Sequence, residues 1–308
     1  MNTADLALFV HTADCGSITR AAEQLDITTA AASAALKRLE RQLGVQLFIR
    51  STRQLRITNE GERFLLYCRK ALDNLAAGRA SIHALEGKIA GELRVSAPSD
   101  LGRNLLLGWI DDIMDQHPAL SINLMLGDSL ADFFLDRMDL AIRYGKQDDS
   151  SRVAFKLASL ERVLCAAPDY LAKFGTPQTP EELTRHNCLL FQVSNRTYDV
   201  WDFVPTQGVG AKSSESVNIR VAGNRCANDS DVVRRWMVAG KGIAFKSRIE
   251  MAPDLQAGRV VRVLSEYQSP PIDLHLVCPN RKQITPAVLL LRDILRERFA
   301  LRLKQPDQ

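Results

Sequence analysis

The sequence lacks the patterns that mark membrane, secreted and metal-binding proteins. No apolar run approaches the ~20 residues that a helix needs to cross a bilayer. Acids stand at Asp5 and Asp14, where a signal peptide would have a basic start and then a cleavage site. The six cysteines are scattered, with no CxxC pair and no metal-site spacing. We therefore expect a cytoplasmic protein with no membrane partner, no metal, and reduced cysteines that are mostly packed.

The common motifs of catalysis are missing as well. The sequence has no glycine-rich phosphate loop, no GxSxG nucleophile motif and no metal-spaced pair among its five histidines. Cys165 and Cys278 lie in apolar, strand-like runs, so we expect them in the core and not as nucleophiles. These absences predict a protein that is not an enzyme and needs no cofactor, with an α/β enzyme kept as an alternative.

A local excess of positive charge is present instead. The 308 residues, 46% hydrophobic and 25% charged, indicate a globular protein of at least two domains. The net charge of +4 is small, but between Ala34 and Thr58 only Glu40 opposes six basic residues. This basic patch comprises Lys37, Arg38, Arg41, Arg50, Arg53 and Arg56.

Three short helices are predicted before Gly44. The first stops near Gly16, Ser17 caps the second, and Thr28 caps a third that ends at Gly44. Three such helices with a tight turn before the third are typical of a helix-turn-helix. At ~100° per residue, the core stripe of the third helix comprises Ala32, Leu36, Leu39 and Leu43.

The opposite face of this third helix combines small residues with positive charge. Its methyl and hydroxyl groups suit contacts with base edges, and a helix N-terminus favours phosphate. The alternative is that the alanines favour helix formation and the charges are simply solvated. The face comprises Ala30, Ser33, Ala34, Lys37 and Arg41, with Thr29 beside it and the cap Thr28 before it.

The next segment, VQLFIRSTRQLRIT, predicts a β-hairpin that carries arginines. Two alternating runs, Leu47 with Ile49 and Leu55 with Ile57, are joined through residues 51–54. A helix-turn-helix followed by such a hairpin is a DNA-binding arrangement, in which the helix enters the major groove and the hairpin reaches the flanking DNA. The hairpin's candidate contacts are Arg50, Thr52, Arg53 and Arg56.

A long helix is predicted from Asn59 to about Gly87. Apolar and small residues recur along it at alternating four- and three-residue steps, a seam suited to pairing with another helix. The alternative is packing against the chain's own domains, and Gly78 weakens a strict zipper. The seam comprises Phe64, Cys68, Ala71, Leu75, Gly78, Ile82, Leu85 and Ile89.

The remaining residues alternate strands and helices, which predicts an α/β fold with a largely parallel or mixed sheet. Helices are expected over 105–117 and 286–301. Ligands of such folds collect beyond the carboxyl ends of strands, where helix N-termini offer free N–H groups. Four turns fit this description, although each could merely cap a helix. Their candidate ligand-binding residues are Ser96, Ser99, Asp100, Asp128, Ser129, Asn228, Asp229, Ser230, Phe245 and Lys246.

Long stretches of the chain resemble one family. ADCGSITRAAEQLDITTAAASAALKRLERQLGVQLFIRSTRQLRITNEGERFL resembles the N-terminal winged helix of LysR-type transcriptional regulators. GELRVSAPSDLG, DLAIRYG, RVLCAAPDYL, ANDSDVVRRWMVAGKGIAF and LQAGRVVRVL resemble the effector domain of the same family. The resemblance implies a winged helix-turn-helix over 1–58 and a linker helix over 59–90. It implies an α/β effector domain over 91–308, built from two periplasmic-binding-protein-like subdomains with a small-molecule cleft between them.

The resemblance also implies a function. It identifies a sequence-specific transcriptional regulator that binds double-stranded DNA under the control of a small-molecule effector. It further implies a homodimer formed through the linker helix, a homotetramer, and RNA polymerase as a partner. Some members respond to peroxide, so a regulator with a thiol sensor stays open, with Cys188 and Cys226 as candidates.

Two departures from the family concern its binding sites. Relatives often begin the recognition helix with Ser-Gln-Pro-Ala, where this chain has residues 28–31, TTAA, and they often carry a basic or polar residue at the place of Ala34. We therefore expect methyl and hydroxyl contacts to bases, and much of the affinity from basic residues. Asp100 stands where relatives have an uncharged residue. It argues against a simple dicarboxylate effector unless Arg143 or Lys246 offsets its charge.

Overall fold

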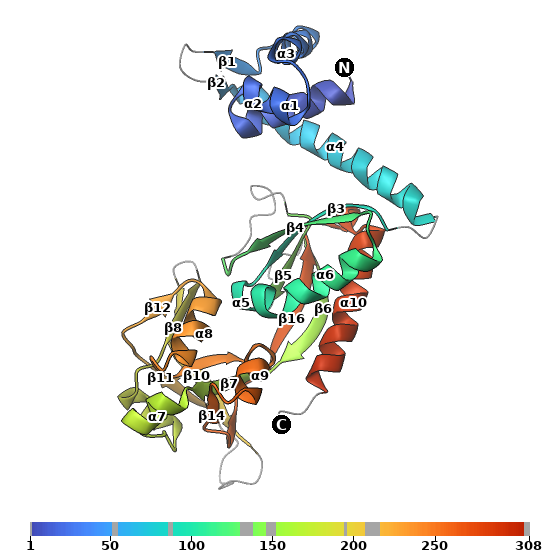
Figure 1. The fold of residues 1–308 in the computed structure, drawn as a ribbon. Coiled ribbons are helices and arrows are strands. Elements are labelled where there is room, and N and C mark those ends of the chain that lie inside the picture. Colours follow the sequence, from blue (N-terminus) through green and yellow to red (C-terminus); the bar gives the residue numbers. More distant parts are fainter. Residues whose placement is uncertain are drawn as a thin grey trace. The chain divides into compact units, whose positions relative to one another are not determined.

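The computed structural model describes residues 2–50, 55–85, 89–129, 138–145, 152–193, 196–206 and 216–304. The chain divides into two compact units, Met1–Leu85 (unit 1) and Glu86–Gln308 (unit 2), both drawn in Figure 1. This division assigns the long helix to unit 1, whereas the sequence predicted a separate segment over 59–90. Among the described helices, none combines the length and the apolar character that a membrane span requires.

Unit 1 consists of three short helices, a hairpin and one long helix. Its elements are α1 (Thr3–Cys15), α2 (Ile18–Gln24), α3 (Thr29–Leu43), β1 (Phe48–Arg50), β2 (Leu55–Ile57) and α4 (Asn59–Leu85). The predicted helix ends are confirmed. The side chains of Ser17 and Thr28 accept hydrogen bonds from first-turn N–H groups of α2 and α3. Gly16 and Gly44 follow α1 and α3 in the left-handed conformation, at φ 60° and 71°.

The core of unit 1 lies where the apolar stripe of α3 meets α1 and the hairpin. Ala32, Leu36 and Leu39 are buried, as the helical periodicity predicts. The ring centroids of Phe9 on α1 and Phe48 on β1 lie 5.4 Å apart within the same cluster. α3 is therefore held by one face, and its opposite face is left to solvent.

The hairpin is confirmed, and the residue of its first strand that packs into the core is Phe48. The carboxylate of Glu40 accepts hydrogen bonds from the N–H groups of Leu47 and Phe48, at 2.9 and 3.2 Å. Leu47, which precedes β1, is buried, and so is Phe48, the first residue of β1. The alternation of buried and exposed side chains along the strand therefore starts at Phe48. Ile49, predicted to form one alternating run with Leu47, is 56% exposed.

The first half of α4 belongs to the core of unit 1, which corrects the predicted pairing seam. The Phe64 ring packs on Phe9, with 5.6 Å between centroids, and Cys68 is buried. Leu75, a seam residue further along α4, is 52% exposed and so stays available for pairing, and Tyr67, which is not part of the seam, is 70% exposed. The N-terminal residues of the seam, Phe64 and Cys68, thus stabilise unit 1 itself. The side chains of the seam residues Ile82 and Leu85 lie outside the described part of the chain.

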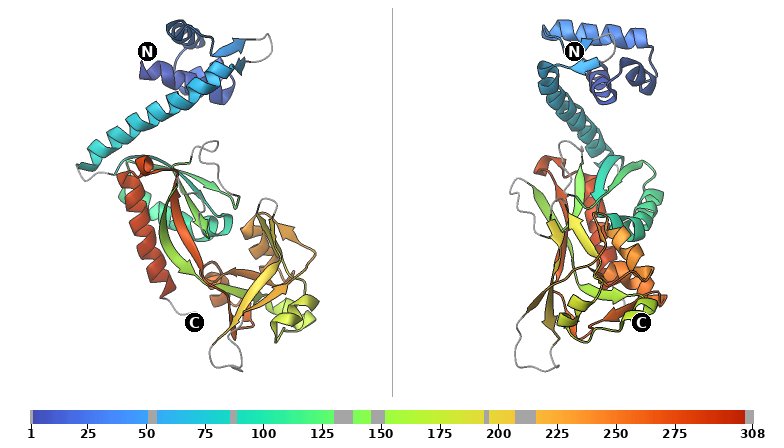
Figure 2. Two further views of the ribbon diagram at one scale, coloured as in Figure 1. Left: turned by 180° about the vertical axis from the view of Figure 1, so that it is seen from behind. Right: turned by 90° about the vertical axis from the view of Figure 1, so that its left-hand side faces the viewer.

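The first subdomain of unit 2 is built on a mixed five-stranded sheet. The strand order is β4-β3-β5-β16-β6, with β3 parallel to β4 and β5, and β16 antiparallel to β5 and β6. α10 runs along this sheet (Figure 2) and meets α6 where the rings of Trp109 and Phe299 touch edge to face, 4.9 Å apart. The elements are β3 (Gly91–Ala97), α5 (Ser99–Leu101), α6 (Leu107–Gln116), β4 (Leu120–Leu126), β5 (Leu140–Tyr144), β6 (Val153–Leu160), β16 (Ile272–Cys278) and α10 (Pro286–Leu303).

The second subdomain of unit 2 combines short sheets with short helices. Its described strands form the orders β13-β7-β14, β12-β8-β9 and β11-β10-β15. Two hydrophobic clusters, one on each side of β7, form its core. The elements are β7 (Arg162–Ala166), α7 (Pro168–Phe174), β8 (Leu190–Val193), β9 (Arg196–Tyr198), β10 (Val200–Pro205), β11 (Val217–Arg220), β12 (Cys226–Ala227), α8 (Ser230–Val238), β13 (Ala244–Ser247), α9 (Arg248–Gln256), β14 (Val261–Val263) and β15 (Tyr267–Gln268).

The chain passes between these subdomains twice, from β6 into β7 and from β15 into β16. The two crossings are joined to each other. The N–H of Arg162 donates to Ser269 Oγ at 3.0 Å, and the Ser269 hydroxyl donates back to the carbonyl of Arg162 at 3.3 Å. The predicted α/β architecture with two subdomains and a mixed sheet is confirmed, and paired crossings are the natural hinge of such a unit.

Two local predictions in unit 2 are wrong. The helix expected from Leu105 begins at Ser99, as α5, and continues through a π-helical turn (Gly102–Leu106) into α6. The segment from Phe245 to Ser247, expected as a turn, is part of β13, because it pairs antiparallel with β7. In both places, the observed helix and strand bring polar residues of the two subdomains together.

Candidate functional site

The outward face of α3 is open to solvent in unit 1. Thr28, Thr29, Ala30, Ala34, Lys37 and Arg41 are exposed, and Ser33 is half-buried. The first turn of α3 contains no acid. The face therefore combines a helix N-terminus, small side chains and two cations, a surface that a phosphate backbone and base edges can approach closely.

Arg38 differs from the other basic residues of α3. Its guanidinium lies 2.5 Å from the carboxylate of Asp5 on α1, and the Asp5 side chain is only 6% exposed. This ion pair joins α3 to α1, so it orients the helix that carries the exposed face. The hairpin residue Arg56 is exposed on β2, and Arg50 lies on β1 with its side chain outside the described part. Thr52 and Arg53, the predicted tip contacts, lie outside the described residues.

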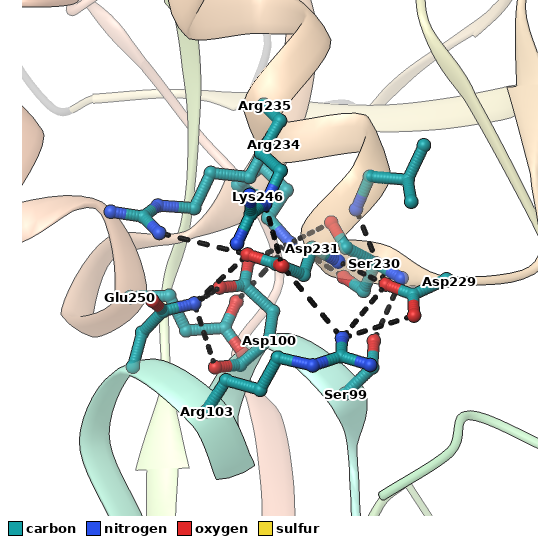
Figure 3. A network of polar contacts seen from close by, with 12 residues as sticks. Ser99, Asp100, Arg103, Asp229, Ser230, Asp231, Arg234, Arg235, Lys246 and Glu250 are labelled. Atoms are coloured by element: carbon teal, nitrogen blue, oxygen red, sulfur yellow. Dashed lines mark hydrogen bonds and ion pairs between the residues drawn. The ribbon is translucent and has the colours of Figure 1, made fainter.

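A second candidate site lies between the two subdomains of unit 2. There, polar side chains of α5 and its π-helical continuation meet the start of α8 and the strand β13 (Figure 3). We call this set the polar cluster. It comprises Ser99, Asp100, Arg103, Asn104, Asp128, Asp229, Ser230, Asp231, Lys246 and Glu250.

The carboxylate of Asp128 joins the N-termini of helices from both subdomains. Its Oδ1 accepts the N–H of Ser99 at 2.9 Å, and its Oδ2 accepts the Ser99 hydroxyl at 2.5 Å. The same Oδ2 accepts the N–H of Ser230, the first residue of α8, at 2.7 Å. Both carboxylate oxygens are thus engaged by donors at positively polarised helix starts.

Lys246 is the buried cation of the polar cluster. Its ammonium contacts the Asp100 carboxylate, donates to Ser230 Oγ at 2.5 Å, and lies 3.6 Å from a carboxylate oxygen of Glu250. Burial alone would lower the pKa of Lys246, but the charges of Glu250 and Asp100 outweigh it and hold that pKa above its usual value. Lys246 therefore stays charged and links β13 of the second subdomain to α5 of the first.

Glu250, four residues after Lys246 and in the first turn of α9, is the carboxyl whose proton affinity is most altered in this cluster. Its side chain is 4% exposed, and the Tyr144 hydroxyl donates to its Oε1 at 2.7 Å. Burial raises the pKa of Glu250 to about 7, with the nearby Asp100 adding to the rise while Lys246 and Tyr144 oppose it. The pKa of Tyr144 is itself raised, first by burial and then by the charge of Glu250.

The rim of the polar cluster is held by arginine and asparagine. Arg103 donates to both oxygens of Asp229, at 3.2 and 3.0 Å, and the Asn104 amide donates to Asp231 at 3.0 Å. Burial by itself would raise the pKa values of Asp229 and Asp231, but hydrogen bonds from Arg103, Asn104 and Arg235 bring both below their usual value. These aspartates remain ionised and bridge the subdomains.

Arg143 lies buried behind the cluster, at 7% exposure. It donates to Ser96 Oγ at 2.6 Å and to the carbonyls of Ile142 and Ser129 at 2.8 and 3.3 Å, all neutral acceptors. Burial lowers the pKa of Arg143, and the charge of Asp128 partly offsets that effect. The guanidinium therefore supports the turn that carries Asp128.

Six of the ten predicted turn residues belong to the polar cluster, and Ser96 and Ser129 instead bind Arg143 behind it. The other two, Asn228 and Phe245, lie outside. Asn228 is exposed, and among the described residues no hydrogen bond joins it to the cluster. Phe245 points away from Lys246, its neighbour on β13, and packs on Trp201 and Phe203 with the Arg162 guanidinium 4.5 Å from its ring. Adjacent residues of a strand face opposite sides, so both cannot enter one site.

The sequence interpretation missed Arg103, Asn104, Tyr144, Asp231 and Glu250. Helical spacing could have found two of them. Arg103 and Asn104 follow Asp100 by three and four residues, the separations at which side chains share a helix face. Glu250 lies in the first turn of α9, four residues after Lys246 on β13, so helical spacing does not connect that pair. Placing the helix start at Ser99 would have revealed the first two.

The cysteines divide clearly between core and surface. Cys165 and Cys278 are fully buried, which confirms that they pack in the core. Cys188, predicted as a possible sensor, is also buried, and burial raises its pKa to about 12, so it is not a reactive thiolate. Cys226 is exposed on β12. Among the described residues no group of His, Cys, Asp or Glu has the arrangement of a metal site.

Comparisons with known proteins agree with both units. Residues 3–62 match the family described as "Bacterial regulatory helix-turn-helix protein, lysR family", and residues 86–300 match the "LysR substrate binding domain". The chain is 28% identical over 294 residues to the HTH-type transcriptional activator AaeR of Escherichia coli strain K12, covering 96% of this chain and 93% of AaeR. It is 32% identical over 297 residues to a putative transcriptional regulator of Pseudomonas aeruginosa, covering 96% and 95%.

Solved structures agree as well. The full-length virulence activator AphB of Vibrio cholerae is similar with a TM-score of 0.59 and 28% identity, over 96% of this chain and 98% of AphB. CrgA of Neisseria meningitidis is similar with a TM-score of 0.60 and 28% identity, over 96% and 99%. These relatives are regulators, which excludes the enzyme alternative. The chain belongs to the LysR family of bacterial transcriptional regulators, with an N-terminal helix-turn-helix that binds DNA and a C-terminal domain that binds an effector.

Proposed function

We propose that the outward face of α3 reads the major groove of its operator through small and hydroxyl side chains. The observation that carries this proposal is the contrast between the two faces of α3, one buried in the core and one exposed with Lys37 and Arg41. Thr29, Ala30, Ser33 and Ala34 offer methyl and hydroxyl groups to base edges, while the cations bind phosphate. Arg38 orients α3 through its pair with Asp5.

The hairpin contributes affinity in this proposal. Arg50 and Arg56 on its strands, with Thr52 and Arg53 between them, are the groups that reach the flanking backbone or minor groove. Because the contacts are ionic, binding weakens as salt increases.

A gel-shift titration on the upstream region of the protein's own gene tests these assignments. We expect Lys37→Ala and Arg41→Ala each to weaken binding for all sequences alike and to reduce the slope of log K against log salt by about 1. Arg63→Ala is the matched control, since Arg63 is exposed on α4 and the substitution removes the same charge from the same unit. Equal salt slopes in all four proteins would refute the assignment. Thr29→Gln should change the preferred sites, because glutamine can bond adenine at two points.

We propose that α4 pairs with α4 of a second copy through its exposed apolar side. Tyr67 and Leu75, eight residues apart and therefore on one side of the helix, are 70% and 52% exposed there, a costly arrangement for a helix that stays alone. Pairing places two α3 helices on successive major-groove turns, about 34 Å apart. We further propose that such dimers form a homotetramer and contact RNA polymerase, as the resemblance implies, and that this assembly acts in the cytoplasm.

Leu75→Glu tests the pairing and should shift the molar mass measured by light scattering toward that of the monomer. A mass equal to the wild-type value would contradict pairing through this side.

We propose that the effector binds at the polar cluster and changes how the two subdomains of unit 2 contact each other. Ion pairs and hydrogen bonds cross this junction, and the paired crossings at Arg162 and Ser269 form a hinge next to it. A ligand that prefers one arrangement shifts the population of subdomain arrangements, and through the dimer it shifts the spacing of the α3 helices. A thermal-shift screen of metabolites on the full chain identifies such a ligand, because binding to the native state raises Tm.

A thiol sensor remains the second candidate, and the exposure of Cys226 favours it. Its thiol donates to Gln192 Oε1 at 3.8 Å, on the neighbouring strand β8. If this thiol senses oxidants, hydrogen peroxide should change DNA binding of the wild type and leave Cys226→Ser unaffected. Oxidant-insensitive binding by the wild type would remove this candidate.

A further inference from the structure

The Asp128 carboxylate is held in the way that a protein holds a bound anion. Three donors converge on it: the N–H and hydroxyl of Ser99, and the N–H of Ser230. The Ser230 N–H also lies 2.9 Å from Ser99 Oγ, so the three donors form one compact set around the two oxygens. A helix start with a serine hydroxyl beside it is a ready anion site, and here the chain supplies the anion itself.

The donors come from two different subdomains. Ser99 begins α5 on the first subdomain, and Ser230 begins α8 on the second. Asp128 follows β4, in the first subdomain, so its side chain bridges the two halves of unit 2. Nearby bridges run in parallel, from Lys246 to Asp100 and from Arg103 to Asp229.

The surrounding charge is unfavourable for a second anion. Asp100 and Glu250 are nearby carboxylates, and together with Ser230 they already engage the ammonium of Lys246. The carboxylate of an incoming ligand would have to displace Asp128 from the Ser99 and Ser230 donors. It would then be repelled at short range by the negative charge of the displaced Asp128.

We infer that Asp128 is an internal anion that closes the two subdomains on each other and makes the effector site selective for neutral or cationic compounds. This inference rests on the proposed effector role of the polar cluster. Asp128 thus acts as a positioning and specificity-determining residue: it takes the donors that an acidic effector would otherwise use. Removing its carboxylate exposes an anion site at the starts of α5 and α8.

Chemical rescue tests the inference on the full-length protein. Asp128→Ala keeps Cβ and removes a group of the size and charge of formate. We expect it to lower the Tm of unit 2 by several degrees, and we expect sodium formate, up to ~100 mM at constant ionic strength, to restore the loss in a saturable way. Sodium chloride should not restore it, and the wild type should not respond to formate. The control Asp115→Ala removes an exposed acid of α6 and should show neither the loss nor the rescue.

Asp128→Asn is the second variant, because it preserves volume if the alanine variant fails to fold. Its amide has one acceptor for three donors and directs an N–H group toward one of them, so its Tm should fall and formate should not restore it. An asparagine variant as stable as the wild type would overturn the inference. Saturable stabilisation of the wild type by formate, or a folded alanine variant without rescue, would overturn it too. These readouts use neither DNA nor an effector, so a failed gel shift or metabolite screen refutes the proposed function separately.

Discussion

The stability of unit 2 should depend on the protonation of Glu250. This carboxyl is buried among Lys246, Tyr144, Asp100 and Asp128, and burial raises its pKa from 4.5 to about 7. In the unfolded chain the same group titrates at its ordinary value. Between pH 4.5 and about 7 the folded protein therefore binds more protons than the unfolded chain, and the free energy of unfolding falls as the pH rises through this window.

The size of the effect follows from the two pKa values. A rise from 4.5 to about 7 corresponds to about 3 kcal/mol, at about 1.4 kcal/mol for each pKa unit. This contribution is fully present below pH 4.5 and is lost above about pH 7. For a domain of this size, where 1 kcal/mol moves Tm by about 2–4 °C, the loss amounts to roughly 6–12 °C.

Glu250→Gln isolates this contribution, because glutamine keeps the volume and the acceptor for Tyr144 and has no titrating proton. We expect the Tm of the wild type, measured by scanning calorimetry from pH 5 to 8, to fall more steeply than that of the variant. The variant should match the wild type near pH 5 and exceed it at pH 8. Glu297→Gln, an exposed position on α10, is the matched control and should follow the wild type at every pH. If Glu250→Gln and wild type show equal slopes, the burial argument is wrong.

Two further predictions concern stability. Lys246→Met should cost roughly 3–5 kcal/mol in urea unfolding at pH 7.5, because Asp100 then lies buried without its cation, and a loss under 1 kcal/mol would contradict this role. Gly61→Ala and Gly108→Ala should have opposite effects on the free energy of unfolding of their units. A Cβ at Gly61 would lie 2.4 Å from a backbone oxygen, so Gly61→Ala should lower the free energy of unfolding by about 1–3 kcal/mol. A Cβ at Gly108 would have no atom within 4 Å, so Gly108→Ala should raise the free energy of unfolding by about 0.5–1 kcal/mol through helix propensity. Effects of equal sign would refute this reasoning.

The winged helix was predictable because its signals are local. Caps at Ser17 and Thr28, the stop at Gly44 and the stripe of Leu36 and Leu39 depend on neighbours in the sequence, and the structure confirms them. The alternating run of Leu47 and Ile49 did not reveal that Leu47 and Phe48 are both buried, because the Glu40 carboxylate, which binds the N–H groups of both residues, lies outside that run.

The predicted pairing seam failed in part for a related reason. A heptad-like pattern records that a helix has an apolar side, but it does not say which neighbour covers that side. Cys68 satisfies the pattern by packing inside unit 1, and Tyr67, one residue earlier, is left exposed. Only the three-dimensional fold separates the part of α4 that stabilises its own unit from the part available to a second copy.

The polar cluster could be predicted only in its individual turns. Ser99, Asp128 and Ser230 each have the sequence of an ordinary cap, and their separations of 29 and 102 residues carry no signal of contact. What joins them is the contact between the two subdomains, in which α8 and β13 of the second lie against α5 of the first. The charges at that junction then have to compensate one another, since a buried carboxylate without a partner is unstable.

A polar junction also suits regulation better than an apolar one would. The more exposed bridge across it, from Arg103 to Asp229, exchanges for water at little net cost when the subdomains separate. Under the effector role proposed above, the free energy between closed and open arrangements has to stay within the few kcal/mol that one small ligand can supply. Under the same proposal, the exposed bridge sets how readily the junction opens, while the buried group of Asp100, Lys246 and Glu250 restricts how it closes, because a closed arrangement has to pair the buried Lys246 ammonium with the carboxylates around it.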